Sequence, residues 1–228
     1  MSFSFDLDGP RHGRPPGQAD ALVILLHGLG ADGNDLIGLA PVFAQVLPNA
    51  AFVSPHAPFP CDMAPFGRQW FSLQNLDQDA ILAGVGAAAP HLEAFIDQEL
   101  DRHGLGDERL ALLGFSQGCM MALHVGLRRE RPCAAILGYS GMLIGTDLLA
   151  GEITSRPPVL LVHGEADEIV PFPSLAAAKA ALEANGVTVQ SHACPGLGHG
   201  IDETGLRLGA AMLRQHLAPA PEPGDLTP

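Results

Sequence analysis

The stretch Arg109-Leu110-Ala111-Leu112-Leu113-Gly114-Phe115-Ser116-Gln117-Gly118 carries most of the information about the fold. It begins with a short apolar run, which predicts a buried β-strand over residues 109–113. A helical pattern then runs from residue 117 to residue 129, so Ser116 lies in a turn between a strand and a helix. Glycines two positions before and after Ser116 allow a very tight turn, because larger side chains there would clash.

The turn around Ser116 fits the pattern G-x-S-x-G, known as a nucleophile elbow. Such a turn presents the serine hydroxyl at the amino end of a helix, where a developing negative charge is stabilised. We therefore predict that Ser116 is a nucleophile. The chain holds 27 glycines, so chance matches are expected, and Ser140 within residues 138–142 is a near match. Ser140 is disfavoured because Met142 replaces the last glycine and no clear amphipathic helix follows at once.

Short apolar runs alternate with helical patterns along the rest of the chain. We expect further strands over 2–7, 21–26, 50–54, 133–137, 159–162 and 187–193, and further helices over 35–46, 79–103, 173–185 and 201–217. Pro90 should kink or split the helix over 79–103. This alternation predicts an α/β fold with a mostly parallel central sheet and helices on both faces. In such sheets ligands bind at the carboxyl ends of the strands, so chemistry is expected in the turns that follow them.

A serine nucleophile needs a histidine base and an acid that orients the base, and in this architecture they follow in the order Ser, acid, His. Of the five histidines after Ser116, His199 lies in the loop 196–201 between a predicted strand and a helix, where an imidazole has the freedom it needs. Three acids follow the strand over 159–162. We predict Asp167 as the orienting acid, with Glu165 as its rival and Glu168 as a solvated residue; spacing alone does not separate them.

A developing oxyanion needs two N–H donors. The first is the backbone N–H of Gln117, directly after the nucleophile. The second is predicted at Leu29, in the glycine-rich turn 27–33 that follows the strand over 21–26. The glycines of this turn also satisfy the dinucleotide pattern G-x-G-x-x-G, but no acidic residue ends a clear second strand near residues 50–56, so nucleotide binding is disfavoured.

Composition excludes several classes of function. There are 12 Lys+Arg against 25 Asp+Glu, for a net charge of −13, and no basic stripe, so we expect neither nucleic-acid binding nor stable association with an anionic membrane. The longest purely apolar run is only 21–26, far short of a bilayer span, and the first residues do not resemble a secretory signal. Four widely spaced cysteines indicate reduced thiols in a cytoplasmic protein rather than a disulfide or zinc site. We expect one domain over 1–217, an exposed loop over 9–17 and a disordered Pro-rich tail over 218–228.

Four segments together resemble the phospholipase/carboxylesterase family of α/β-hydrolases, which includes bacterial carboxylesterases and acyl-protein thioesterases. The segments are Leu26-His-Gly-Leu-Gly-Ala-Asp-Gly33, Gly114-Phe-Ser-Gln-Gly118, Gly164-Glu-Ala-Asp-Glu-Ile-Val-Pro171 and Gly198-His-Gly-Ile201. The resemblance spans roughly residues 15–217. It implies an α/β-hydrolase fold, a Ser116–Asp167–His199 triad, oxyanion donors at Leu29 and Gln117, and no metal or organic cofactor. Dimers are common among such relatives, so a homodimer is an expectation.

The acyl pocket should be apolar. Its expected lining residues are Phe66, Trp70, Phe71, Leu73, Met142 and Leu143, although Trp70 and Phe71 could equally be core residues of a short strand. The connection over 139–156 is too short for a large lid domain, which favours a small-molecule ester with a short to medium acyl chain. An acyl-protein thioesterase or a lysophospholipase is the alternative, and a non-catalytic binding protein on this fold is a more distant one. The segment 59–78 is unlike the family pattern and is expected to influence the substrate range.

Overall fold

The computed structural model describes residues 7–218 of the chain. Seven strands form one sheet in the order β1-β3-β2-β6-β7-β8-β9. These strands are β1 (Arg11–Gly13), β2 (Ala21–Leu26), β3 (Ala50–Val53), β6 (Leu110–Phe115), β7 (Ala135–Tyr139), β8 (Val159–Gly164) and β9 (Val189–Cys194). Within this seven-stranded sheet β1 runs antiparallel to β3, and the other pairings are parallel. The predicted strand over 2–7 and the predicted tail over 218–228 lie outside the described residues, apart from Leu7 and Ala218.

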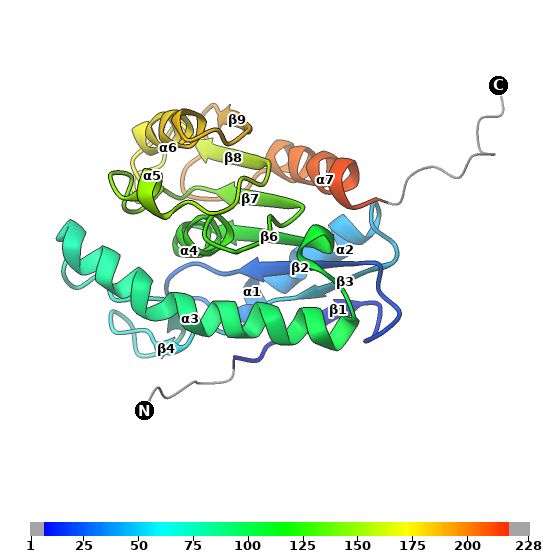
Figure 1. Cartoon of the computed structure of the whole chain (residues 1–228). Helices are drawn as coiled ribbons and strands as arrows, with labels where there is room; N and C mark the ends of the chain where they lie inside the picture. The colour runs from blue at the N-terminus through cyan, green and yellow to red at the C-terminus, as the bar shows by residue number, and fades with distance from the viewer. Residues whose placement is uncertain (1–6, 219–228) are drawn as a thin grey trace, which may run out of the picture.

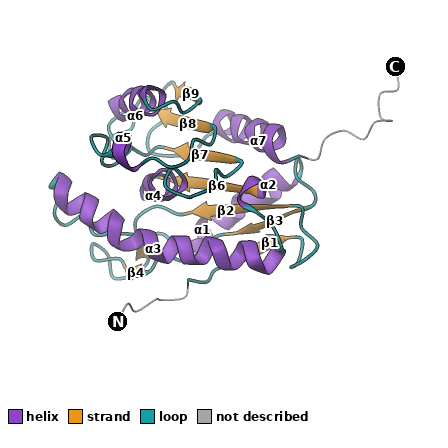
Figure 2. Cartoon of the chain, in the orientation of Figure 1, coloured by secondary structure: helices purple, strands orange, loops and turns teal. Residues whose placement is uncertain are grey.

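Helices cover both faces of the sheet, as Figure 2 shows. They are α1 (Gly33–Leu36), α2 (Ala40–Ala44), α3 (Gln78–His103), α4 (Gln117–Gly126), α5 (Leu149–Glu152), α6 (Pro173–Ala184) and α7 (Glu203–Leu217), with short 3-10 turns η1 (Ile37–Leu39) and η2 (Asp107–Arg109). One apolar core lies between the sheet and α3, α4 and α6, and a second lies between the sheet and α1, α2 and α7. The predicted α/β architecture is therefore confirmed.

Strand β2 shows how the apolar runs position the two cores. Successive side chains of a strand point to opposite faces. Leu22, Ile24 and Leu26 accordingly join the core under α3 and α4, while Val23 and Leu25 join the core under α2 and α7. All six residues of the strand are fully buried, which explains why the sequence shows an unbroken apolar run rather than an alternating one.

Several local predictions differ from the structure. The segment 35–46, expected as one helix, is divided between α1, η1 and α2. Helix α3 continues through Pro90 without a break, and Figure 1 shows a bend in its axis. The loop expected over 9–17 contains β1, whose three residues are all exposed and thus show no apolar period. The segment 59–78 contains a small hairpin of β4 (Phe59–Pro60) and β5 (Arg68–Gln69).

Helix α3 is the single helix within residues 7–218 whose length and mean hydropathy would allow it to cross a membrane. The scan of the sequence for long apolar runs did not single out α3, because its apolar residues are interrupted by polar ones. One face of α3, with Val85, Leu92 and Phe95, is buried in the core against the sheet. A helix in the core of a protein can have the same length and composition as a membrane-spanning helix, and α3 lies in such a core environment.

The carboxyl ends of the parallel strands share one edge of the sheet. The turn after β2, the turn between β6 and α4, and the loops after β7, β8 and β9 all converge there (Figure 1). The connection after β7 contains only the four-residue helix α5, so residues 7–218 form no large lid domain over this edge. The functional site is therefore sought here.

Candidate active site

Ser116 lies in a strained turn between β6 and α4. Its backbone has φ 53° and ψ −117°, a conformation that residues with side chains rarely adopt. A Cβ atom on Gly114 would lie 2.2 Å from the Gly118 carbonyl oxygen, and one on Gly118 would lie 1.9 Å from the Leu26 carbonyl oxygen. Glycine is thus required at both positions, as the elbow pattern predicts.

Ser140, the near match, is also held at a positive φ of 48°. Its hydroxyl donates to the carbonyl oxygen of Gly200 at 3.1 Å, and the residue is 1% exposed. A Cβ atom on Gly141 would meet the sulfur of Cys119 at 2.5 Å, which accounts for the glycine there. Ser140 is therefore buried and supports the loop that carries His199, a role that the sequence pattern did not indicate.

Asp167 and His199 are joined by a hydrogen bond. Asp167 follows β8, His199 follows β9, and the imidazole Nδ1 lies 2.8 Å from Asp167 Oδ2. The other carboxylate oxygen, Oδ1, accepts the N–H groups of Ile169 and Val170, each at 2.9 Å. The rival acids, at positions 165 and 168, are both exposed. The structure thus places Asp167, and not its rivals, on the histidine.

The environment of Asp167 favours its ionised form. Burial by itself raises the pKa of this carboxyl, but the hydrogen bonds from His199 and from the N–H groups of Val170 and Ile169 outweigh burial, so the pKa lies below its ordinary value. An ionised carboxylate accepts the Nδ1 proton of His199 and leaves Nε2 free to accept another proton. This is the tautomer that a general base requires.

Ser116 and His199 line the same cavity, which has a volume of about 440 Å³. The ring of Phe115 lies beside the imidazole of His199, with centroids 4.8 Å apart. Most of the remaining wall is apolar. It consists of Gly28, Leu29, Leu73, Leu76, Ile81, Phe115, Gln117, Met120, Met142, Ile144, Ile169, Val170 and Pro171. The cavity therefore combines a small polar cluster with an apolar wall, as small-molecule sites do.

The two predicted oxyanion donors, Leu29 and Gln117, both contribute to this wall. Within residues 7–218, neither backbone N–H donates a hydrogen bond to another protein group. Two backbone hydrogen bonds to Arg68 hold the glycine-rich turn that carries Leu29. Gly30 donates its N–H to the Arg68 carbonyl oxygen at 2.9 Å, and Arg68 donates its N–H to the Ala31 carbonyl oxygen at 2.8 Å. Two free donors on a fixed backbone are suited to binding an oxyanion.

His27 supports the same turn from beneath. Its Nε2 accepts the Ala57 N–H at 3.0 Å, so Nδ1 carries the proton and donates to the Gly28 carbonyl oxygen at 2.7 Å. Burial lowers the pKa of this imidazole, which keeps the ring neutral. The indole N–H of Trp70 donates to the His27 carbonyl oxygen at 3.0 Å. Sequence patterns did not identify this role of His27.

The predicted acyl-pocket residues separate into three groups. Leu73 and Met142 line the cavity beside Ser116, and Leu143 lines an adjoining cavity. Trp70 and Phe71 are fully buried and do not form part of the wall, because they pack in the core beneath the glycine-rich turn and α3. Phe66 is 75% exposed and also lies outside the wall. Periodicity did not separate lining from packing because a core residue and a wall residue are equally apolar.

The side chain of Gln117 links the elbow to the segment 59–78. Its Oε1 accepts the Trp70 N–H at 2.8 Å, and its Nε2 donates to the Phe71 carbonyl oxygen at 2.7 Å. Gln117 is only 1% exposed. The sequence indicated a role for its backbone N–H alone, since nothing in the local pattern shows that the amide meets a segment more than 40 residues away.

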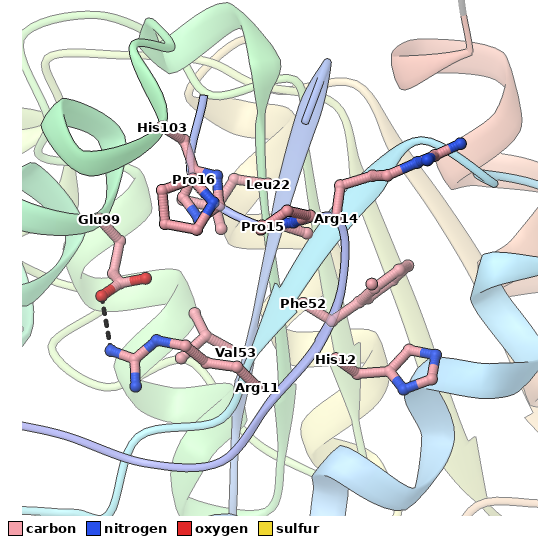
Figure 3. A pocket seen from close by; sticks show the side chains of 12 residues that line it. Arg11, His12, Arg14, Pro15, Pro16, Leu22, Phe52, Val53, Glu99 and His103 are labelled. Carbon is pink, nitrogen blue, oxygen red and sulfur yellow. Dashed lines mark hydrogen bonds and ion pairs between the residues drawn. The ribbon is translucent and has the colours of Figure 1, made fainter. Parts of the chain in front are cut away.

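A second cavity, of about 210 Å³, lies between β1, β3 and the carboxyl-terminal end of α3 (Figure 3). It shares no residue with the cavity beside Ser116. Glu99 Oε1 accepts from Arg11 at 2.7 Å, which ties α3 to the edge strand β1. Glu99 Oε2 and His103 Nδ1 are buried and have no hydrogen-bond partner among the described residues. Because the Arg11–Glu99 contact joins a helix to an edge strand, we assign this region a structural role.

Comparison with known proteins identifies the family of the chain. The sequence profile of the Phospholipase/Carboxylesterase family matches residues 13–217. Esterase YpfH of Escherichia coli K12 is 29% identical over 88% of this chain and 84% of that protein. Acyl-protein thioesterase 1 of Gibberella zeae is 31% identical over 89% of this chain and 93% of its own length.

Solved structures show the same likeness. The crystal structure of esterase PE8 superimposes with a TM-score of 0.89 and 41% identity, and covers 93% of this chain and 100% of that one. Arabidopsis thaliana SOBER1 superimposes with a TM-score of 0.75 and 28% identity, over 86% of this chain and 99% of that one. The family match over residues 13–217 and these relatives together show that the chain is an ester hydrolase that belongs to the phospholipase/carboxylesterase family of α/β-hydrolases.

Proposed function

We propose that this protein is a serine carboxylesterase that cleaves small esters with short to medium acyl chains through an acyl-enzyme intermediate. One observation carries the proposal: His199, which a 2.8 Å hydrogen bond joins to Asp167, lines the same cavity as a serine held in a strained elbow. These three groups come from three separate loops at one edge of the sheet, and no packing requirement alone explains their convergence.

The proposed reaction follows from these positions. Ser116 Oγ attacks the ester carbonyl carbon while His199 Nε2 takes the hydroxyl proton, and the N–H groups of Leu29 and Gln117 bind the oxyanion. The protonated His199 then donates its proton to the leaving alcohol, and the acyl group stays on Ser116. Water, activated in turn by His199, releases the acid. Asp167 orients the imidazole and stabilises its cation throughout. This sequence of steps requires no metal or organic cofactor.

The cavity supports an acyl group of limited length. Its wall beside Ser116 is formed by Leu73, Met120 and Met142, and its volume of about 440 Å³ is in the lower part of the range for small-ligand sites. The exposed side chains of Leu76 and Ile169 stand at its rim. An apolar wall without a large lid suits a soluble ester that enters from water.

An acyl-protein thioesterase is the second candidate, and one observation favours it. A further cavity of about 380 Å³ lies between α3 and the loop after β7, and it shares Ile81, Met142 and Ile144 with the first. A longer acyl chain that passes these residues would find room there. A relative that carries the name acyl-protein thioesterase supports the same candidate. A lysophospholipase would use the same chain path.

Hydrolysis of p-nitrophenyl esters from acetate to palmitate, beside an S-palmitoyl peptide and a lysophospholipid, tests the proposal. We expect the highest kcat/KM for short and medium chains. Ser116→Ala should lower kcat by about 10⁴- to 10⁶-fold. Ser155→Ala is a matched control, because Ser155 is also a buried serine, but its hydroxyl donates to Gly126 away from the cavity.

Each outcome decides between the candidates. Turnover of the S-palmitoyl peptide far above that of every oxygen ester would replace the carboxylesterase with the thioesterase. Undiminished turnover in Ser116→Ala would remove the proposed mechanism. Wild-type protein that binds esters without hydrolysing any would instead be a binding protein on this fold. Homodimer formation and a cytoplasmic location stay predictions from the sequence.

A further inference from the structure

The carboxylate of Asp167 has one neighbour that the proposed mechanism does not use. His163 Nε2 lies 3.2 Å from Asp167 Oδ2, the same oxygen that accepts from His199 Nδ1 at 2.8 Å. Both side chains are enclosed: that of His163 is 1% exposed and that of Asp167 is 0% exposed. Two imidazoles thus approach one carboxylate oxygen, one from the open side of the site and one from the core.

The proton on the buried ring can be assigned from its partners. His163 Nε2 lies 2.9 Å from the carbonyl oxygen of Val170, which can only accept a hydrogen bond. Nε2 therefore carries a proton, and Asp167 Oδ2 lies 3.2 Å from the same nitrogen. The ring of Phe172 packs edge-on against the imidazole, with centroids 6.1 Å apart, and restricts its rotation.

These contacts close a small ring of interactions around the turn 167–170. The N–H of Val170 donates to Asp167 Oδ1, and the carbonyl oxygen of Val170 accepts from His163. Both polar groups of Val170 are thus held, one by each member of the His163–Asp167 pair. With Oδ1 occupied by backbone N–H groups, the carboxylate keeps Oδ2 directed at His199.

We propose that His163 is a positioning residue that holds the Asp167 carboxylate and the turn 167–170 in the orientation that His199 needs. The proposal rests on the proposed esterase function. His163 does not itself line the cavity, and it acts through Asp167 and through the backbone of Val170, a residue of the cavity wall. Its loss should reduce turnover more than substrate binding, because the side chains that form the acyl cavity are unchanged.

Two amide variants separate positioning from packing. In His163→Gln the side-chain amide nitrogen can occupy the place of Nε2, whereas in His163→Asn the amide is too short to reach it. For ester hydrolysis we expect kcat of His163→Asn to fall by about 10- to 100-fold, the range for residues that orient a catalytic group through a hydrogen bond, with KM within about twofold. His163→Gln should recover most of the loss. His103→Gln, a change at a buried histidine beside the second cavity, should leave kcat unchanged.

A spectroscopic measurement tests the same idea without substrate. The proton between His199 Nδ1 and Asp167 should give a low-field ¹H NMR resonance that is absent from Asp167→Asn. We expect this resonance to be retained in His163→Gln and to shift or broaden away in His163→Asn. If His163→Asn does not fold, His163→Leu takes its place. Equal kcat and equal resonances in the short and long amide variants would overturn the proposal.

The two proposals fail in different ways. If wild-type protein hydrolyses esters and Ser116→Ala does not, while His163→Asn keeps full kcat and the resonance, the positioning role is wrong and the esterase stands. If wild-type protein hydrolyses no ester, the esterase proposal is wrong, and the resonance alone still decides whether His163 holds the Asp167–His199 pair.

Discussion

Asp167 and Glu99 are both buried carboxylates, but they are held by different partners. The Asp167 side chain is 0% exposed and is bound by backbone N–H groups and by His199. The Glu99 side chain is 4% exposed, and its Oε1 accepts from the guanidinium groups of Arg11 at 2.7 Å and Arg102 at 3.3 Å. Asp167 follows a strand at the carboxyl edge of the sheet, whereas Glu99 lies on helix α3 beside the edge strand β1.

This difference explains why one carboxylate suits chemistry and the other suits structure. Around Asp167 the donors are neutral, so the negative charge is not cancelled and can stabilise a cation that forms on His199. Around Glu99 the charge is already compensated by the guanidinium groups of Arg11 and Arg102. A buried acid is thus a candidate for catalysis when its partners leave its charge available, and burial alone is not the criterion.

The largest effect that would test this comparison is on activity. In Asp167→Asn the side chain keeps its shape but loses its negative charge. It can therefore no longer hold His199 in the tautomer that a general base requires. We expect kcat to fall by about 10⁴-fold in ester hydrolysis. Glu99→Gln is the matched change at the other carboxylate and should leave kcat within about twofold. A similar loss in both variants would refute the distinction.

The next effect is on stability. Arg11→Met keeps much of the aliphatic stem but removes the cation, which leaves Glu99 buried with only the longer contact to Arg102. Because the Arg11 side chain is 34% exposed, we expect a loss of about 1–3 kcal/mol in the free energy of unfolding, less than for a fully buried pair. Urea denaturation measures this value. If Arg11→Met left the free energy of unfolding unchanged but lowered kcat, the structural role assigned to the Arg11–Glu99 contact would be wrong.

The smallest expected effect is a pH dependence of stability from two buried histidines, one beside Glu99 on α3 and the other on α4. Burial lowers the pKa of His103, one turn after Glu99, and it lowers the pKa of His124 to about 4. The unfolded chain therefore binds protons on these rings near pH 6.5 that the folded chain does not bind. Stability should fall as the pH decreases from about 6.5 to about 4, and it should be fully restored above that window. His124→Gln should flatten this slope, and His12→Gln, at an exposed histidine, should not.

Much of the site was predictable because its parts are local. The elbow around Ser116 and the turn around Leu29 follow directly after apolar strands, and each has its own glycine pattern. The edge strand β1 was missed because it is exposed on every residue and exists only through its pairing with β3. Trp70 was assigned to two alternatives, since its apolar character is the same in a cavity wall and in a core.

The sequence by itself determined the α/β order of elements, the strained turn at Ser116 and the three acids from which a partner of His199 had to come. Each of these depends on neighbouring residues, and short-range sterics and periodicity are encoded locally. Only the tertiary structure decided that Asp167 and not Glu165 reaches His199, that Ser140 supports the loop of His199, and that His163 approaches Asp167 from the core. These contacts join different strands and loops, and their distances depend on how the sheet and its helices pack.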